Sequence, residues 1–213
     1  MTSLPTPTSP SERRRSLQRE EARRAILDAT EELLVADGYE RFSMRRLAER
    51  CGYTAPTIYH YFRDKQGLLD AVLDARLRLV LERLRRVPSG LDPAETVRQM
   101  LGEFARFGLD HPTHHRLLSM NRPEGAPMVP AAEEIGGLFE GLFGELSRRG
   151  RLRGGDVEQA IQFIWMVLHG IVSLRSARPD VEWKQWIVDY SLDTALRGLL
   201  TGGCGAQGEG SES

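Results

Sequence analysis

Apolar residues recur at helical spacing along most of the chain. Between residues 16 and 37, for example, Ala22, Ile26, Ala29 and Leu33 are three or four positions apart, as on one face of an α-helix. No segment alternates apolar and polar residues convincingly over the length of a strand. The pattern therefore predicts an all-α protein.

Capping residues, prolines and glycines divide this pattern into nine predicted helices. Ser43, Thr54 and Asp156 supply N-cap side chains, and Gly38 ends the first helix. Residues 1–15, rich in Pro, Ser and Thr and then basic, are expected to form a disordered arm, and residues 201–213 a disordered tail. The predicted helices cover residues 16–37, 44–50, 55–62, 65–86, 93–110, a short segment from Pro112, 131–149, 157–176 and 183–200.

The short helices 44–50 and 55–62 carry the first functional signal. They are separated by Cys51-Gly52-Tyr53, which is the spacing of a helix-turn-helix with glycine in the turn. Their apolar positions would pack on the first helix, and the opposite face of the second keeps small and hydroxyl-bearing residues at its N-terminal end. Such an end can enter a major groove and reach base edges.

The stretch FSMRRLAERCGYTAPTIYHYFRDKQGLLDAVL, residues 42–73, resembles the N-terminal domain of the TetR family of bacterial transcriptional regulators. The matching positions are Ser43, Leu47-Ala48, Gly52, Thr57-Ile58-Tyr59, Phe62, Lys65 and Leu68-Leu69. The resemblance implies a TetR-like architecture, with a helix-turn-helix DNA-binding domain over residues 16–65. A ligand-binding and dimerisation domain would follow over residues 66–200.

The same resemblance implies individual contacts with double-stranded DNA. Arg45 would contact a base, since arginine pairs well with guanine O6 and N7, and Arg46 is a second candidate beside it. Arg13–Arg15 would add contacts that release counterions. Bases would be read by Thr54, Ala55, Pro56 and Thr57, and phosphates contacted by Ser43, Tyr59, His60 and Lys65.

The second half of the chain predicts a homodimer with an internal ligand chamber. Residues 161–174 are apolar almost all round and must be covered on several sides, so we expect the last two helices to pair with a second copy. Two recognition helices would then meet a palindromic site. The resemblance implies a pocket within helices four to eight, whose occupation by a small molecule moves the fourth helix and releases DNA. Candidate lining residues are Phe104, Phe107, Leu117, Met120, Met128, Phe139, Leu142, Phe143, Trp165, Met166 and His169.

Composition changes this picture little. The net charge is −1, and residues 1–65 carry a small positive excess, twelve Lys and Arg against ten Asp and Glu. Cys51 and Cys204 form no disulfide or zinc motif, and residues 1–11 lack the character of a signal peptide. The apolar run 163–168 is short for a bilayer span. We therefore expect a cytoplasmic protein without a membrane partner.

Several alternatives stay open. An enzyme would have to use His111, His114 and His115, but no nucleophile elbow, phosphate loop or carboxylate pair accompanies them. Pro112 interrupts their spacing, so we expect neither a metal nor a cofactor. A DNA-binding regulator with a solid C-terminal core, or an activator instead of a repressor, would fit the same motif.

The predicted helix 131–149 contains four glycines, at positions 136, 137, 141 and 144. Each costs about 1 kcal/mol of helix stability relative to alanine. We expect this helix to be the wall of the chamber that yields to a ligand, which an apolar lining suggests is greasy or aromatic.

Overall fold

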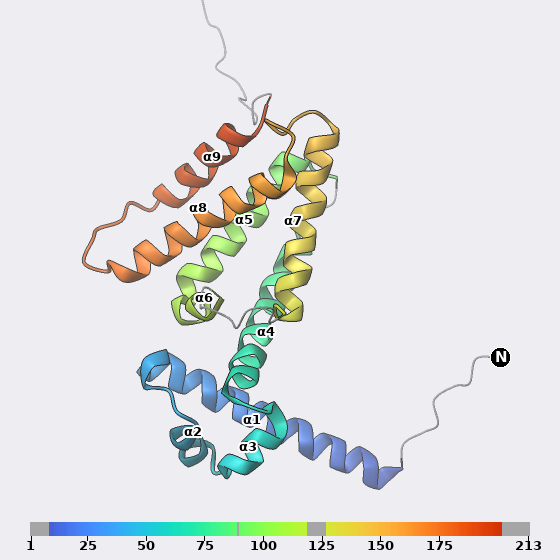
Figure 1. Ribbon diagram of the computed structural model, residues 1–213, viewed down its shortest axis with the longest axis vertical. Coiled ribbons are helices and arrows are strands. Elements are labelled where there is room, and N and C mark those ends of the chain that lie inside the picture. Colours follow the sequence, from blue (N-terminus) through green and yellow to red (C-terminus); the bar gives the residue numbers. More distant parts are fainter. Residues whose placement is uncertain (1–8, 89, 119–126, 202–213) are drawn as a thin grey trace, which may run out of the picture. The chain divides into compact units, whose positions relative to one another are not determined.

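A computed structural model describes residues 9–88, 90–118 and 127–201, and this part of the chain forms nine α-helices and one 3-10 helix (Figure 1). A bridge between Leu152 and Leu200 is the one β-type pairing among these residues. The all-α, nine-helix prediction is therefore confirmed. The helices are α1 Pro10–Asp37, η1 Tyr39–Arg41, α2 Met44–Cys51, α3 Ala55–Phe62, α4 Lys65–Leu84, α5 Pro93–Asp110, α6 Pro112–Leu118, α7 Pro130–Arg148, α8 Val157–Ala177 and α9 Ile187–Leu199.

The chain separates into two compact units between Val72 and Leu73. This division falls inside α4 and lies beyond the expected boundary at residues 65 and 66. The helix therefore contributes its first turns to the N-terminal unit and its remaining turns to the C-terminal unit.

The first helix begins earlier than predicted, and the expectation of disorder is wrong for residues 10–15. The Ser9 hydroxyl accepts a hydrogen bond from the Glu12 backbone N–H (3.3 Å), and the Glu12 carboxylate accepts one from the Ser9 N–H (2.7 Å). Pro10 occupies the first turn, where its missing N–H costs nothing. This capping box explains why helix begins at Pro10. Residues 1–8 of the predicted arm lie outside the described residues.

The N-terminal unit is built around a small core shared by α1, α2 and α3. Ile26, Leu34, Leu47 and Ile58 have no exposed surface. Gly52 ends α2 with φ of 72°, a left-handed conformation that glycine adopts without strain, and this lets the chain turn from α2 into α3. The core thereby fixes which face of α3 stays exposed.

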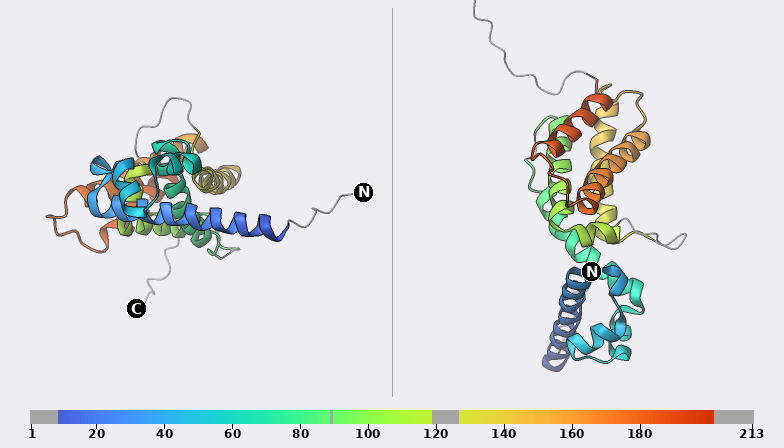
Figure 2. Two further views of the ribbon diagram at one scale, coloured as in Figure 1. Left: turned by 90° about the horizontal axis from the view of Figure 1, so that it is seen from below. Right: turned by 90° about the vertical axis from the view of Figure 1, so that its left-hand side faces the viewer.

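The C-terminal unit has α5 at its centre. Helix α5 contacts α6, α7, α8 and α9, and Figure 2 shows α8 and α9 side by side. Phe104, Phe143 and Leu146 are among the most deeply buried side chains. A Cβ atom on Gly108 would lie 2.8 Å from Val172 Cγ2, so glycine at this position allows α5 and α8 to approach closely.

The last helix begins at Ile187, four residues after the predicted start at Trp183. The Trp183 indole N–H donates to the Arg178 carbonyl (3.0 Å), and Arg178 also pairs with Asp180 (2.7 Å). These bonds hold the link after α8 in turns, so its apolar residues do not extend the helix. Thr201 is bonded to the Arg151 carbonyl through its N–H (2.9 Å) and is ordered, whereas residues 202–213 of the predicted tail lie outside the described residues.

Helix α8 combines a buried face with an unusually apolar exposed face. Ile164, Leu168 and Val172 are buried, whereas Met166 is 67% and Leu174 53% exposed. By length and composition the helix is apolar enough to cross a membrane, the one such helix found in the described residues. A single helix of this kind is weak evidence for a membrane span.

Candidate DNA-binding surface and ligand cavity

The N-terminal end of α3 is organised by two threonines. Thr54 is the N-cap and accepts a hydrogen bond from the Thr57 N–H (3.4 Å), and the two hydroxyl oxygens are 2.9 Å apart. Ile58 and Phe62 anchor the opposite face in the core. Thr54 and Pro56 are exposed, and Ala55 and Thr57 half-buried. The four residues expected to read bases thus lie together at one exposed helix end.

The following turn of α3 presents the two expected phosphate contacts. Tyr59 is 43% exposed and His60 is also exposed. Burial of Ile58 and Phe62, one residue before Tyr59 and two after His60, orients both side chains outward. The face available to DNA therefore continues along the helix beyond its first turn.

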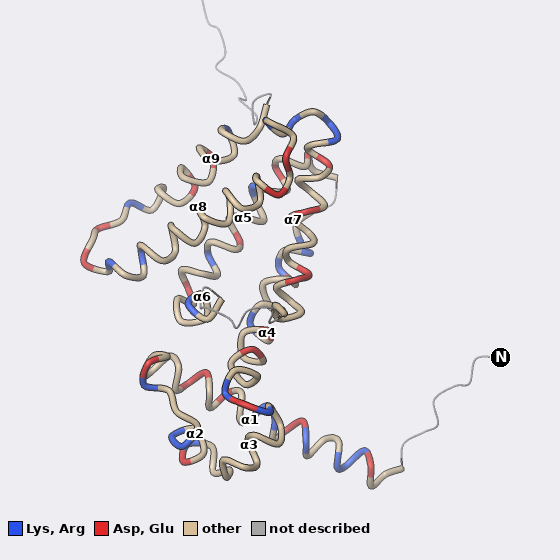
Figure 3. Tube along the Cα trace, viewed as in Figure 1, with Lys and Arg blue, Asp and Glu red and all other residues tan. Residues whose placement is uncertain are grey.

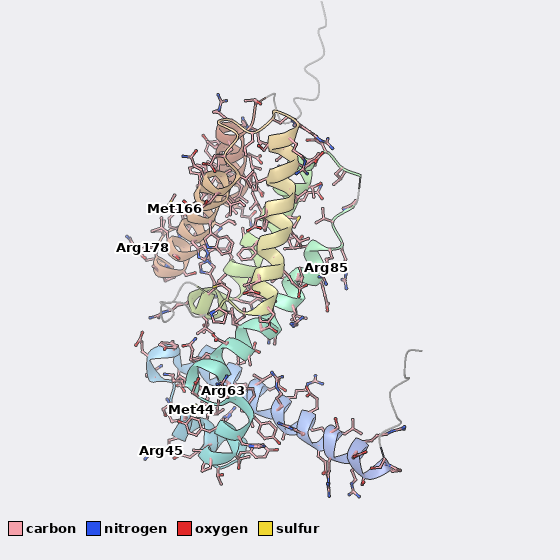
Figure 4. All side chains as sticks on the ribbon, turned by 45° about the vertical axis from the view of Figure 1, so that its right-hand side comes forward. Met44, Arg45, Arg63, Arg85, Met166 and Arg178 are labelled. Carbon is pink, nitrogen blue, oxygen red and sulfur yellow. The ribbon has the colours of Figure 1, made fainter. Side chains whose placement is uncertain are left out.

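The structure distinguishes the two candidate arginines of α2. The Arg45 side chain is 87% exposed and only loosely paired with Glu49 (3.4 Å), and Figure 4 shows it at the outer edge of the unit. Arg46 instead pairs with Asp37 at 2.7 Å and donates to the Arg41 carbonyl at 3.3 Å. Arg46 therefore holds α2 against the end of α1, and Arg45 is the better placed of the two for a base.

Ser43 and Lys65 have structural partners of their own. The Ser43 hydroxyl accepts a hydrogen bond from the Arg46 N–H (3.3 Å) and caps α2. The Lys65 ammonium lies 4.7 Å from the centre of the Tyr39 ring and donates to the Phe42 carbonyl at 3.4 Å. Lys65 is thus positioned from inside the unit, and its phosphate contact stays a prediction.

The C-terminal unit contains an apolar cavity of about 330 Å³. Helices α4 to α8 all contribute to its lining, and Gln162 supplies the single side-chain amide among the residues that line it. A cavity of this size is at the lower end of the range for small-molecule sites. The lining residues are Leu77, Leu101, Phe104, Leu118, Met128, Ala132, Ile135, Gly136, Phe139, Phe143, Ile161, Gln162, Ile164, Trp165 and Leu168.

The predicted ligand residues divide into those that line the cavity and those that do not. Phe104, Phe139, Phe143, Trp165 and Met128 line it. Phe107 and Leu117 are buried away from the cavity, and Leu142 is half-buried outside it. Met166 is on the exposed face of α8 (Figure 4), and His169 borders a shallow groove beside Trp165. Met120 lies outside the described residues.

Sequence reasoning favoured aromatic residues and missed much of the aliphatic lining. Ile161, Ile164, Trp165 and Leu168 follow one another at intervals of three, one and three along α8, which is the spacing of a single helix face. That spacing was a usable signal for α8. The glycine at position 136 also lines the cavity, and a Cβ atom there would meet nothing within 4 Å.

Helices α4 and α7 are joined at one end of the cavity wall by polar contacts. The N-cap residue of α7, Val129, makes no side-chain cap, but the Asp74 carboxylate accepts a hydrogen bond from the Ala131 N–H at 2.8 Å. Glu134 pairs with Arg85 (2.6 Å) and lies 4.0 Å from Arg78. We call these residues, Asp74, Arg78, Arg85, Ala131 and Glu134, the α4–α7 clamp.

The histidine cluster is packed into the second unit. The His115 ring lies 4.6 Å from the His169 ring, which in turn lies 4.5 Å from Trp165. Burial, with a smaller contribution from His169, lowers the pKa of His115 to about 4. Burial also lowers the pKa of His169. Among the described residues no group of three potential ligands is arranged to hold a metal ion.

These features define a helix-turn-helix protein with a separate helical domain that contains a cavity. Residues 26–72 match the model of the tetR family of bacterial regulatory proteins, and residues 97–199 match the tetracycline repressor-like C-terminal domain. The chain belongs to the TetR family and is a DNA-binding transcriptional regulator. Members of this family bind DNA and small molecules, act as dimers, are generally cytoplasmic and are not a class of enzyme.

Curated relatives are similar to part of the chain. A transcriptional regulator of Saccharopolyspora erythraea is 35% identical over 113 residues, which is 52% of this chain and 45% of that protein. The transcriptional repressor KstR of Rhodococcus jostii is 36% identical over 86 residues, 40% of each chain. The matches thus span less than half the length of these relatives.

Solved structures share the fold over most of the chain. A single-substitution variant of TetR from Acinetobacter baumannii, in complex with minocycline, has a TM-score of 0.63 at 24% identity, over 81% of this chain and 93% of that one. BioQ with its double-stranded DNA operator has a TM-score of 0.61 at 21% identity, over 83% and 96% of the two chains. At these identities the likeness concerns the fold.

Proposed function

We propose that this chain is a repressor that binds a palindromic operator as a homodimer and is released when a small molecule enters the cavity of the C-terminal unit. The observation that carries the proposal is the apolar cavity of about 330 Å³ in a chain that also has an exposed, capped recognition helix. A solid C-terminal core, the main alternative, would lack such a space.

The base sequence of the operator would be read by Arg45 and by the first turn of α3. Thr54, Pro56 and Thr57 present hydroxyl and apolar groups that suit thymine methyls and base-edge donors or acceptors. Tyr59, His60 and Ser43 would contact phosphates and fix the register of α3 on the duplex. Lys65 and Arg46 would act mainly by holding the unit in shape, since both have internal partners.

The dimer would form through the exposed apolar faces of α8 and α9. Met166 and Leu174 on α8, with Trp186 and Tyr190 at the start of α9, are each more than half exposed. Large contiguous apolar surface on a soluble protein marks an interaction site, and a two-fold interface can cover the same patch on both copies.

The effector would be small, largely apolar and uncharged. None of the residues lining the cavity is charged, and Gln162 offers one position for a polar group. Burying a charge without a partner is costly, so a charged compound would bind poorly. Helix α7 forms one wall and is bonded to α4 through the α4–α7 clamp, which would pass a displacement of that wall to α4.

Three further parts of the proposal follow from the family. We infer a cytoplasmic location and no catalytic activity. We also favour repression over activation. The His115 and His169 rings pack against each other, and they would serve the core and the rim of the groove instead of a reaction.

Selection from a random duplex library followed by mass measurement of the complex tests the proposal. We expect recovery of an inverted repeat bound by two or more chains. A screen of neutral aromatic and aliphatic compounds should then identify one that raises the melting temperature and dissociates the complex. A monomer without sequence preference would refute operator binding, and failure of every compound to shift the melting temperature would favour the solid-core alternative.

A further inference from the structure

The N-terminal half of α1 projects from the unit that contains the recognition helix. All residues from Ser9 to Glu21 are exposed, and the first buried residue is Ala22. Figure 1 shows this part of the helix extending past α3 within the same unit. Three turns of helix are therefore maintained by the capping box at Ser9 without burying an apolar face.

This projecting segment is basic, with one arginine stripe. Residues 10–24 contain six arginines and three glutamates, and Figure 3 shows the charged positions along the helix. Arg15, Arg19 and Arg23 are spaced by four, so they share one helix face over about 12 Å. By the same spacing Glu20 and Glu21 lie on other faces, whereas Glu12 lies on the stripe face three residues before Arg15 and accepts the Ser9 N–H in the capping box. From Arg15 to Arg23 the stripe is thus a continuous row of positive charge.

The stripe is directed toward α3 by two contacts. The Arg19 guanidinium lies 6.0 Å from the centre of the Tyr61 ring, and that of Arg23 lies 5.4 Å from the centre of the Phe62 ring. Within the described residues none of the three stripe arginines forms an ion pair with a carboxylate. Their charges therefore remain available to an external anion.

We propose that Arg15, Arg19 and Arg23 bind DNA phosphates and extend the contact with the duplex beyond α3. The inference rests on the proposed DNA binding and adds a surface to it. The planar guanidinium group matches phosphate in bidentate geometry, and stacking on aromatic rings holds two of the three groups in place. Since a duplex carries a negative charge about every 1.7 Å along its axis, a row of about 12 Å faces several phosphates.

The dependence of affinity on salt tests this inference. The double variant Arg15→Ala with Arg19→Ala removes two stripe charges from exposed positions and leaves Arg23 on its ring. The control, Arg24→Ala with Arg83→Ala, removes two charges from exposed positions away from the stripe, one on another face of α1 and one on α4. Binding of the selected duplex and of an unrelated duplex is measured between low and moderate salt for all three proteins, with melting temperatures to verify folding.

We expect the stripe variant to lower the slope of log K against log salt by about two for each bound chain, and so by about four for a dimer, on both duplexes, because each phosphate contact contributes about 0.9. The control should change the slope by less than half as much. An unchanged slope in the stripe variant, or an equal decrease in both variants, would overturn the stripe while leaving operator binding intact. Failure of the unmodified chain to bind any duplex would overturn the proposed function and the stripe together.

Discussion

Replacing Gly136 by leucine should occupy part of the cavity and stabilise the protein at the same time. Position 136 is on α7 and lines the cavity, and a Cβ there would meet no atom within 4 Å apart from its chain neighbours and the backbone of its own helix. Removing a glycine from a helix interior contributes about 1 kcal/mol. Burying the new side chain among apolar groups contributes on the order of 1–2 kcal/mol more. We expect the free energy of unfolding to rise by about 2–3 kcal/mol.

The matched control is Gly137→Leu, on the next position of the same helix. Gly137 is exposed, and a Cβ there also meets nothing within 4 Å. This variant receives the helix contribution of about 1 kcal/mol without filling the cavity. Urea denaturation measures both values, and fluorescence of the neutral dye prodan reports access to the cavity.

The two variants should also differ in function. Gly136→Leu should bind the selected duplex as the unmodified chain does, but lose prodan binding and the response to any effector found by the screen. Gly137→Leu should keep both. If the two variants were equally stable and bound prodan equally, the space at Gly136 would not exist in solution, and the assignment of the cavity as a ligand site would fail.

Three more substitutions address the remaining parts of the site. Arg45→Ala should weaken operator binding by about 1–3 kcal/mol and change the free energy of unfolding by no more than about 0.5 kcal/mol. Arg46→Ala should mainly lower the free energy of unfolding, by about 0.5–1 kcal/mol. Binding isotherms and urea melts distinguish the two variants, and a larger loss of binding in Arg46→Ala than in Arg45→Ala would contradict the assignment. Asp74→Ala removes the hydrogen bond to the first turn of α7 and should lower the free energy of unfolding by about 1–2 kcal/mol in the same melts. An unchanged free energy of unfolding would mean that the α4–α7 clamp does not stabilise the protein. Because the pKa of His115 is lowered to about 4, the unfolded chain takes up a proton below about pH 6.5 that the folded chain resists, so stability should fall between pH 6.5 and 4. His169, whose pKa burial also lowers, contributes in the same direction, so His115→Gln should reduce that dependence in melts taken across the range without abolishing it. An unchanged profile would show that His115 does not contribute.

The helix-turn-helix could be predicted from the sequence because its determinants are local. Capping by Ser43 and Thr54 and the glycine at position 52 act within a few residues, and the structure contains each of them. The start of α1 was also encoded locally, as Ser9-Pro10 followed by Glu12. It was missed because the prolines and serines around it indicated disorder more strongly than the capping box indicated a helix.

The cavity could be predicted only in part because it depends on how distant helices pack. Helical spacing shows which residues are buried, but it does not show where opposed helices leave a space. Phe107 is buried as firmly as Phe104, yet only Phe104 lines the cavity. Likewise, Met166 and Trp165 are adjacent in the apolar sequence, but only Trp165 reaches the interior space. The pairing of Arg46 with Asp37 is another such tertiary outcome.

Trp165 borders the cavity on one side and, on the other, the groove lined by Met166 and Gly170 on the exposed face of α8. A change of side chain at this position would alter effector preference and subunit pairing together. Residues of α7 such as Ala132 and Gly136 carry no such double constraint, since they border the cavity but not that groove. Substitutions in α7 could therefore let descendants of this protein respond to different effectors without any change in how their subunits pair.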